Sequence, residues 1–503
     1  MLKLMKYIKK FWAPILFCVA LLFGQSQAEL SLPDLMSDIV SVGIQAGGFD
    51  GAVSDVLTTE TFDHLLVLMD DDDQKIMKDS YELVEAGKVD SDIKSSFPES
   101  KNQDVYVLKD LSSEEMDTLN DALTKPMLIV TSIDKMDPNS EEYKERFKDL
   151  PEGITIYQVL GTMTFEQKEE MFKEIDTQIE SMGESTLSIA AGNGVKAEYE
   201  RLGADTEDVQ MSYIIGVGLK MLGIALLGSV AAIIVSLLSS RIGAGLARDV
   251  RKDVFAKVES FSNDEFNKFS TASLITRTTN DITQVQNVMT MVLRIVCFAP
   301  MMGIGALIKA INNSPSMTWI IALVLVVMLC VIGVAFVVVL PKFKVIQELI
   351  DKLNLTMREN LSGMLVIRAF GNEKYSENRF NNANDDLTKV NLFVNRAMAS
   401  IMPIMMFMFN VVSVLIIWFG AKQVDLGNID IGQMMAFIQY AMNIIMSFLM
   451  IAMISIMLPR ASVAAERIFE VLSTEPQILD PTTPKAFIES KKGLLEFKNV
   501  TFK

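Results

Sequence analysis

The chain has 503 residues, half of them hydrophobic, and a formal net charge of −17. Several uninterrupted apolar stretches are long enough to cross a bilayer, so the sequence predicts a membrane protein rather than one soluble core. The acidic balance excludes a generic nucleic-acid-binding protein, which needs basic surface. The single His and the three Cys are scattered along the chain, without the spacing of metal ligands, which excludes a His/Cys zinc site or a disulfide scaffold.

The first apolar stretch, residues 11–24, follows Lys3, Lys6, Lys9 and Lys10 and is only 14 residues long. A helical pattern continues after it through residues 29–40. Two interpretations stay open. Residues 1–28 are either the start of a first membrane span or a cleaved signal peptide, for which Ser26-Gln27-Ala28 has the small residues of a cleavage site.

The next segment carries most of the negative charge. Residues 29–210 hold 42 acidic and 15 basic residues, a net charge of −27, whereas the rest of the chain has a net charge of +10. This shift predicts a domain of residues 47–205 inserted between two membrane spans. Such a domain would attract cations and cationic peptides.

Three β-rich runs, 105–108, 127–131 and 154–159, each precede a helical pattern within this domain. The helices have start signals at Ser112 with Glu115, Asn139 with Glu142, and Thr164 with Gln167. We therefore predict a small α/β or α+β fold. The Asp70–Asp73 run is either a solvated acidic loop or a divalent-cation site, and His64 is interpreted as structural.

Five further apolar spans follow, at 221–238, 288–308, 319–340, 401–419 and 434–458, each near the ~20 residues that a bilayer requires. The connections after spans 3 and 5 are short, whereas those after spans 2 and 4 are long, helical and rich in Lys and Arg. The positive-inside rule places the N-terminus and both long connections in the cytoplasm, and the acidic domain outside. Cys18, Cys297 and Cys330 lie in apolar spans and are interpreted as small hydrophobic residues.

The long connections carry recognisable motifs. Segments 241–255 (RIGAGLARDVRKDVF), 261–269 (FSNDEFNKF) and 270–281 (STASLITRTTND) resemble the first intracellular loop of ABC exporters of the multidrug or lipid-flippase type. Segment 359–373 (ENLSGMLVIRAFGNE) is similar to their second loop. Segment 464–472 (AAERIFEVL) resembles the linker to their nucleotide-binding domain, and 495–502 (LEFKNVTF) that domain's first strand.

The resemblance implies an all-α polytopic membrane domain of six long helices with the acidic domain inserted. The expected parts are the first span with an outward extension (1–46), the acidic extracellular domain (47–205), spans 2–6 with two coupling loops (206–475), and the linker with the first strand of a truncated nucleotide-binding domain (476–503). Such exporters bind ATP and Mg²⁺. No Gly-x-x-x-x-Gly-Lys-Ser/Thr loop occurs in this sequence, nor do the Walker B and signature motifs, so we expect no nucleotide or metal to bind this part of the protein.

The same resemblance assigns coupling to an ATPase domain to two short helices, for which the rival interpretation is a pair of solvated turns. The candidate coupling residues are Asn263, Asp264, Glu265, Phe266, Phe269, Gly363, Met364, Val366, Ile367 and Phe370.

Spans 5 and 6 are rich in Met, and in span 6 these residues form a stripe at helical spacing. Thioethers suit a promiscuous apolar cavity, but ordinary helix packing explains the stripe equally well. Amides among apolar neighbours are costly facing lipid and would face a lumen or a partner helix. The candidate cavity residues are Met405, Asn410, Gln439, Asn443, Met446 and Met450.

We therefore expect the transmembrane subunit of an ATP-driven exporter that moves amphipathic or hydrophobic compounds, lipids or peptides out of a bacterial cell by alternating access. Its partners would be a second half-transporter, identical or not, and membrane lipid. One alternative is a membrane receptor whose outer domain senses a ligand. Another is a pore or scaffold without a motor.

Overall fold

The computed structural model describes residues 5–86, 88–134, 156–164, 167–168, 171–172, 179, 182–478, 483, 493 and 496–501. Within these ranges six helical segments are long and apolar enough to cross a membrane: Lys6–Gln45, Thr206–Glu259, Thr271–Asn313, Pro315–Ser362, Glu373–Asp425 and Ile431–Ser473. Each contains one of the six predicted apolar spans. The prediction of a polytopic helical membrane domain is therefore confirmed.

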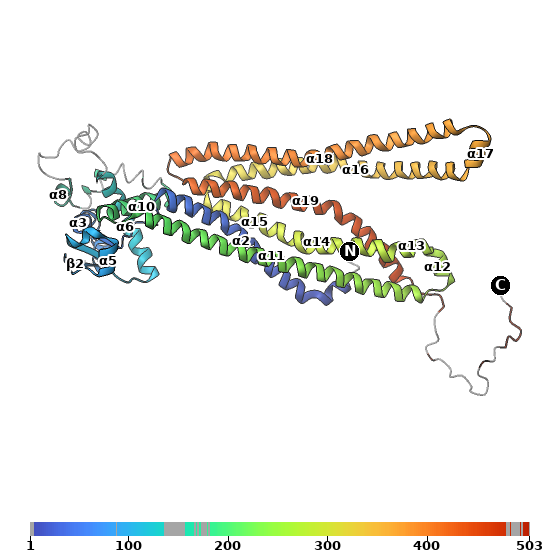
Figure 1. Cartoon of the computed structure of the whole chain (residues 1–503), viewed down its shortest axis with the longest axis horizontal. Helices are drawn as coiled ribbons and strands as arrows, with labels where there is room; N and C mark the ends of the chain where they lie inside the picture. The colour runs from blue at the N-terminus through green and yellow to red at the C-terminus, as the bar shows by residue number, and fades with distance from the viewer. Residues whose placement is uncertain are drawn as a thin grey trace. The chain divides into compact units, whose positions relative to one another are not determined.

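The six segments are built from the following elements (Figure 1). The first comprises α1 (Met5–Ile8), η2 (Lys9–Phe11), α2 (Trp12–Asp38) and the π-helical η3 (Ile39–Gln45). The second is α11 (Thr206–Glu259), and the third comprises α13 (Thr271–Thr276), η5 (Arg277–Asp281), α14 (Ile282–Met291), η6 (Val292–Val296) and α15 (Cys297–Asn313). The last three are η7 (Pro315–Met317) with α16 (Thr318–Ser362), then α18 (Glu373–Asp425), then α19 (Ile431–Ser473). Two short helices, α12 (Asn263–Phe269) and α17 (Met364–Ala369), lie in the long connections.

The chain divides into two compact units, which are described separately. Unit 1 contains residues 1–20, 234–297 and 453–503, and unit 2 contains residues 21–233 and 298–452. Buried side chains of α11, α14 and the last turns of α19 form the core of unit 1. Unit 2 has one core among α15, α16, α18 and α19 and a second one around a small sheet.

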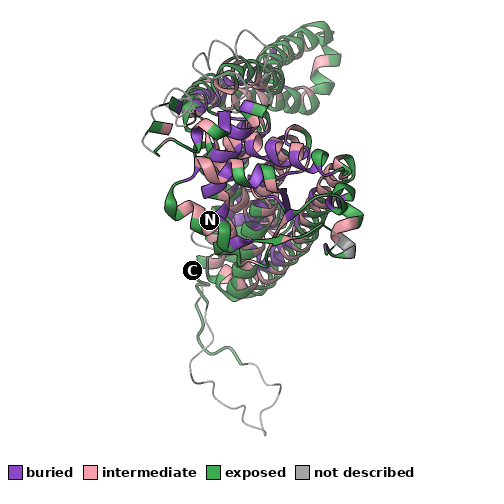
Figure 2. Ribbon diagram, turned by 90° about the vertical axis from the view of Figure 1, so that its left-hand side faces the viewer, coloured by how far each residue is buried: buried purple, intermediate pink, exposed green. Residues whose placement is uncertain are grey.

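Large apolar side chains also cover the outside of the long helices. Leu222, Leu226 and Leu237 of α11 and Val337 of α16 each expose about two thirds or more of their surface. Figure 2 shows buried residues between helices and exposed residues along their outer faces. Contiguous apolar surface of this kind is typical of a protein surrounded by lipid.

The sheet belongs to the segment that we call the acidic lobe, residues 47–205. Strands β1 (Val56–Thr58), β3 (Val105–Leu108) and β2 (Tyr81–Val84) pair antiparallel in the order β1-β3-β2. Val107 of β3 lies opposite Val56 on one side and Glu82 on the other. The helices of the lobe are α3 (Thr59–Leu68), α4 (Asp71–Ser80), α5 (Ser91–Ser96), η4 (Pro98–Lys101), α6 (Ser113–Asp134), α8 (Ile156–Leu160) and α10 (Glu184–Arg201).

Two of the three strands expected in the lobe are wrong. Residues 105–108 form β3, but 127–131 lie in α6, because a continuous helical stripe from Leu119 to Ile133 is buried and this tertiary packing overrides the β-branched residues. Residues 156–159 begin α8, while 154–155 lie outside the described residues. The sequence pattern also missed β1 and β2, which are three and four residues long.

Two of the three predicted helix start signals form hydrogen bonds in the structure. The Ser112 amide and hydroxyl both donate to Glu115 at 2.8 Å, and these bonds lower the pKa of Glu115. The Thr164 amide donates to Gln167 at 3.0 Å, whereas Asn139 lies outside the described residues. The Asp70–Asp73 run is not a loop, because Asp71–Asp73 form the first turn of α4 and Asp70 caps it by accepting from the Asp73 amide at 2.8 Å. For the alternative of a divalent-cation site, the described residues contain no group of three His, Cys, Asp or Glu that could hold a metal ion.

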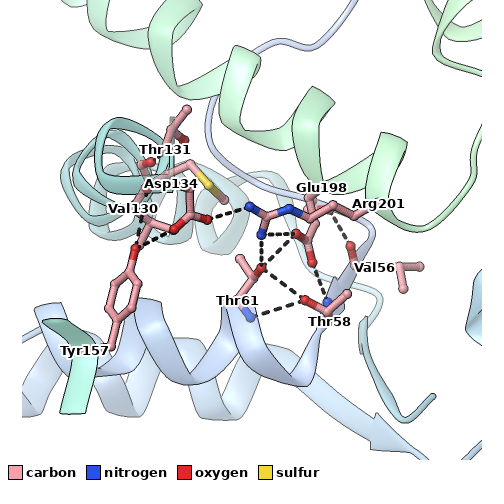
Figure 3. Close-up of polar contacts among 11 residues, drawn as sticks. Val56, Thr58, Thr61, Val130, Thr131, Asp134, Tyr157, Glu198 and Arg201 are labelled. Atoms are coloured by element: carbon pink, nitrogen blue, oxygen red, sulfur yellow. Dashed lines mark hydrogen bonds and ion pairs between the residues drawn. The ribbon is translucent and has the colours of Figure 1, made fainter. Parts of the chain in front are cut away.

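A buried carboxylate organises the polar side of the lobe (Figure 3). Glu198 of α10 is 2% exposed and accepts from the Thr58 amide at 2.6 Å and the Thr61 hydroxyl at 2.7 Å. Arg201 lies 3.7 Å from Glu198 and donates to Asp134 at 2.6 Å. One network therefore joins β1, α3, α6 and α10.

His64 predicts a pH dependence of lobe stability. Its ring stacks on Tyr157 at a centroid distance of 3.5 Å, and burial lowers the His64 pKa below its usual value of 6.5. The unfolded chain protonates His64 more readily than the folded lobe does. The contribution of neutral His64 to the stability of the lobe is therefore complete above pH 6.5 and declines as the pH falls below 6.5. We expect His64→Phe, which keeps the stack, to reduce the loss of protection from hydrogen exchange in α3 between pH 7 and 5. An unchanged pH profile would contradict this role for His64.

Candidate functional site

Helix α12 begins with a capping box. The Ser262 amide and hydroxyl donate to Glu265 at 2.7 and 2.6 Å, and these hydrogen bonds lower the Glu265 pKa. Phe269 is 5% exposed and stacks on Phe261 at 5.8 Å between ring centroids. Asn263, Asp264 and Phe266 are exposed. The helix is therefore supported from within its unit and presents one polar and aromatic face outward.

The last turns of α19 hold this first loop in place. Arg277 donates to the Arg467 carbonyl at 2.7 Å and to Glu470 at 2.8 Å, and its guanidinium lies 4.9 Å from the centroid of the Phe269 ring. Arg467 also lies 3.4 Å from the buried Asp281. The backbone amide of Gln477, five residues beyond the linker motif, donates to Glu265 at 3.2 Å. Of these charged residues the sequence singled out only Glu265, because the pairing of Arg277 with Glu470 and of Asp281 with Arg467 depends on contacts about 190 residues apart.

Helix α17 has no comparable support, and none of its residues is buried. Leu365 is 84% exposed and Val366 61%, and Phe370, which follows the helix, is 82% exposed. Met364 is exposed, and Gly363 and Ile367 are half-buried. Exposed apolar groups on a short helix are typical of a surface that another protein covers.

Helices α16 and α18 place α17 far from the acidic lobe within unit 2. They pair antiparallel, with Trp319 against Phe419 at one end and Arg379 bound to Glu359 at 2.7 Å near the other. Beyond the Phe419 end, the Gly183 amide of the lobe donates to the Gly427 carbonyl at 2.9 Å. Since α16 has 45 residues, its ends are about 65 Å apart, and α17 and the lobe lie at opposite ends of the pair.

The candidate cavity residues separate into two groups. Met405 is 4% exposed and packs in the core of α15, α16, α18 and α19. The other five are exposed or half-buried. Gln439, Asn443, Met446 and Met450 share one face of α19, and Asn410 of α18 donates to the Met406 carbonyl at 2.9 Å.

A charged contact joins three helices near the same end as the lobe. Asp34 of α2 accepts from Lys309 of α15 at 2.7 Å and from the Tyr440 hydroxyl of α19. Tyr440 is fully buried. The Lys309 and Asp34 side chains are partly exposed, so this contact links the three helices with a modest stabilising contribution. Among the described residues no cluster of three His, Cys, Asp or Glu could hold a metal ion.

We expect Asp34→Asn to destabilise the detergent-solubilised protein by about 1 kcal/mol, because Lys309 loses its counter-charge. The exchanged pair Asp34→Lys with Lys309→Asp should recover part of this loss in a thermal unfolding scan. The control is Asp386→Asn, whose partner Lys352 lies 3.8 Å away on the surface, and we expect it to change stability little. Equal losses for Asp34→Asn and the exchanged pair would contradict an electrostatic role.

Comparison with known proteins gives a consistent result. The sequence pattern of the ABC transporter transmembrane region matches residues 187–448, just over half of the chain. An uncharacterized ABC transporter ATP-binding protein of Mycobacterium tuberculosis is 38% identical over 290 residues, which are 58% of this chain and 50% of that protein.

Two further relatives are similar over half of the chain or more. An uncharacterized ABC transporter ATP-binding protein of Bacillus subtilis is 30% identical over 57% of this chain and 49% of its own length. A fatty acid ABC transporter ATP-binding/permease protein of Mycobacterium bovis is 26% identical over 50% of this chain and 40% of its own length. The chain thus spans about half the length of the curated relatives it matches.

Proposed function

Since the chain belongs to the ABC transporter transmembrane region family, we propose that it is the membrane half of an ATP-driven exporter. The observation that carries the proposal is the bare apolar surface of α17, at the far end of two long helices from the acidic lobe. Together with α12 it supplies the two short helices through which an ATPase domain could act on the membrane domain.

Coupling would proceed through rigid elements. If α17 lies in a groove of an ATPase domain, movement of the groove displaces the paired ends of α16 and α18. The first loop would move with the linker, because Arg277 and Glu265 hold α12 and α13 to the end of α19 and to Gln477. The membrane domain would alternate between inward-open and outward-open states in this way.

The orientation follows from charge. The long connections carry the Lys and Arg residues, so they and the N-terminus would be cytoplasmic and the acidic lobe extracellular, with the protein in a plasma membrane. The separation of α17 from the lobe along α16 supports this arrangement, because elements on opposite sides of a bilayer must lie apart by more than its ~30 Å hydrocarbon core.

Partners and cofactors are proposed from the relatives. Several are named ATP-binding proteins, so the complete protein would use ATP with Mg²⁺ on its nucleotide-binding domain. A second half-transporter would complete the translocation path. The Met-rich, amide-bearing face of α19 would line that path and accept amphipathic or hydrophobic cargo, lipids or peptides.

The test is transport by the complete gene product in lipid vesicles, with ATP, without ATP, and with a non-hydrolysable analogue. We expect ATP-dependent movement of an amphipathic dye or a fluorescent fatty acid, together with hydrolysis that the cargo stimulates. ATP-independent leakage of the dye would instead support a pore. A ligand response without transport would support a receptor.

A further inference from the structure

The turn between α18 and α19 lies against the acidic lobe through direct backbone contact. The Gly183 amide, just before α10, donates to the Gly427 carbonyl at 2.9 Å. A Cβ at Gly183 would overlap the Asn428 carbonyl oxygen, so only glycine fits. Gly427 itself has a φ of +74°, which also favours glycine.

One buried carboxylate reinforces this contact from three sides. Asp430 is 4% exposed and caps α19 by accepting from the Gln433 amide at 2.8 Å. It also accepts from the hydroxyls of Ser41 in η3 and Ser185 in α10. A buried carboxylate is costly unless hydrogen-bond donors surround it, so losing any of these donors destabilises Asp430. Asp430 therefore holds together the end of the first span, the lobe and the start of the last span.

The contact borders solvent rather than a dry core. A polar cleft of about 540 Å³ lies beside it, lined by Ser41, Ser185 and Asn428 among others. Water can therefore reach the donors and acceptors when they separate, which lowers the cost of breaking them. A contact that opens and closes needs water to reach its hydrogen-bonding groups, whereas a contact that stays closed does not.

We propose that the acidic lobe is a latch, in which Gly183 and Ser185 hold the outer turn of α19 through Gly427 and Asp430. The lobe is joined covalently to the first and second spans, whereas Asp430 belongs to the turn between the fifth and sixth. The latch therefore ties spans 1 and 2 to spans 5 and 6 at the lobe end. This inference rests on the proposed function, since alternating access requires helices to separate at that end for cargo release.

The first experiment locks the latch with a disulfide. Ser185→Cys and Asp430→Cys are introduced together into the complete protein with Cys18, Cys297 and Cys330 replaced by alanine. Oxidation should slow ATP-driven transport by at least about tenfold, and reduction should restore it. The single variant Asp430→Cys, oxidised in the same way, controls for the loss of Asp430, and the single variant Ser185→Cys controls for the loss of the Ser185 hydroxyl. If the oxidised protein, with its cross-link intact, transports cargo as fast as the same protein after reduction, the proposal is overturned.

The second experiment loosens the latch. Gly183→Ala obstructs the contact, whereas Gly216→Ala, which has open space around it, is the matched control. Spin labels at the exposed Met36 and Leu426 report the distance between the outer ends of the first and fifth spans. We expect Gly183→Ala to populate longer distances without ATP and Gly216→Ala to leave the distribution unchanged. Identical distributions for both variants would overturn the proposal.

The two readouts separate failure of the latch from failure of the proposed function. If neither the unaltered protein nor any variant transports cargo, the exporter assignment fails, while the distances still test the latch. If transport proceeds but neither the cross-link nor Gly183→Ala changes rate or distance, the exporter assignment stands and the latch fails.

Discussion

Replacing Leu365 and Phe370 by serine should reduce ATP-driven transport by roughly thirtyfold or more and leave the folding of the membrane domain unchanged. Both side chains are more than 80% exposed and no residue of α17 is buried, so their removal takes nothing from the core. If they are anchors in a groove of an ATPase domain, the two truncations together cost at least about 2 kcal/mol of docking energy, which is about thirtyfold. The measurement is transport per ATP hydrolysed by the complete protein in vesicles.

The control for this prediction is Leu426→Ser. Leu426 is 61% exposed and lies in the turn at the opposite end of α18, so the substitution also removes an exposed apolar side chain while α17 stays intact. We expect Leu426→Ser to transport as much cargo per ATP hydrolysed as the wild-type protein does. Equal losses from both ends of the helix, or hydrolysis and transport that stay coupled without Leu365 and Phe370, would contradict a docking role for α17.

Replacing Glu198 by alanine should have the largest effect on the acidic lobe. The substitution leaves the buried Thr58 amide and Thr61 hydroxyl without their acceptor and removes one counter-charge of Arg201. The loss of a buried, multiply bonded carboxylate costs about 3 kcal/mol. Hydrogen exchange of the amides in β1 and α3 should therefore speed up by roughly a hundredfold.

Glu200→Ala is the matched control, because Glu200 is an exposed residue of the same helix. We expect it to change exchange rates little. Glu198→Gln should fall between the two, since it keeps an acceptor oxygen and loses the charge. Similar protection in Glu198→Ala and wild type would show that the network in Figure 3 does not stabilise the lobe.

The sequence predicted the membrane helices well because their signal is local. A run of about 20 apolar residues has few alternatives to a membrane span, and all six predicted runs lie inside helices of the structure. The capping box at Ser112 was equally readable, since its two partners are three residues apart.

The lobe was predicted less well because its strands are short and its helices are decided by packing. Residues 127–131 have β-branched side chains, but they continue a stripe that α6 buries against the rest of the lobe. The buried charges were missed for a related reason. Asp430, Arg277 and Glu198 look like surface residues in the sequence, and only contacts between distant segments reveal their partners.

Photo-cross-linking from Leu365 tests the central claim most directly. A photoreactive phenylalanine analogue at this position in the complete protein, illuminated in native membranes, should attach to a nucleotide-binding domain, and the attached peptide can be identified by mass spectrometry. Attachment to lipid, or to a peptide of the acidic lobe, would contradict the account, because α17 would then not be a contact for a cytoplasmic motor.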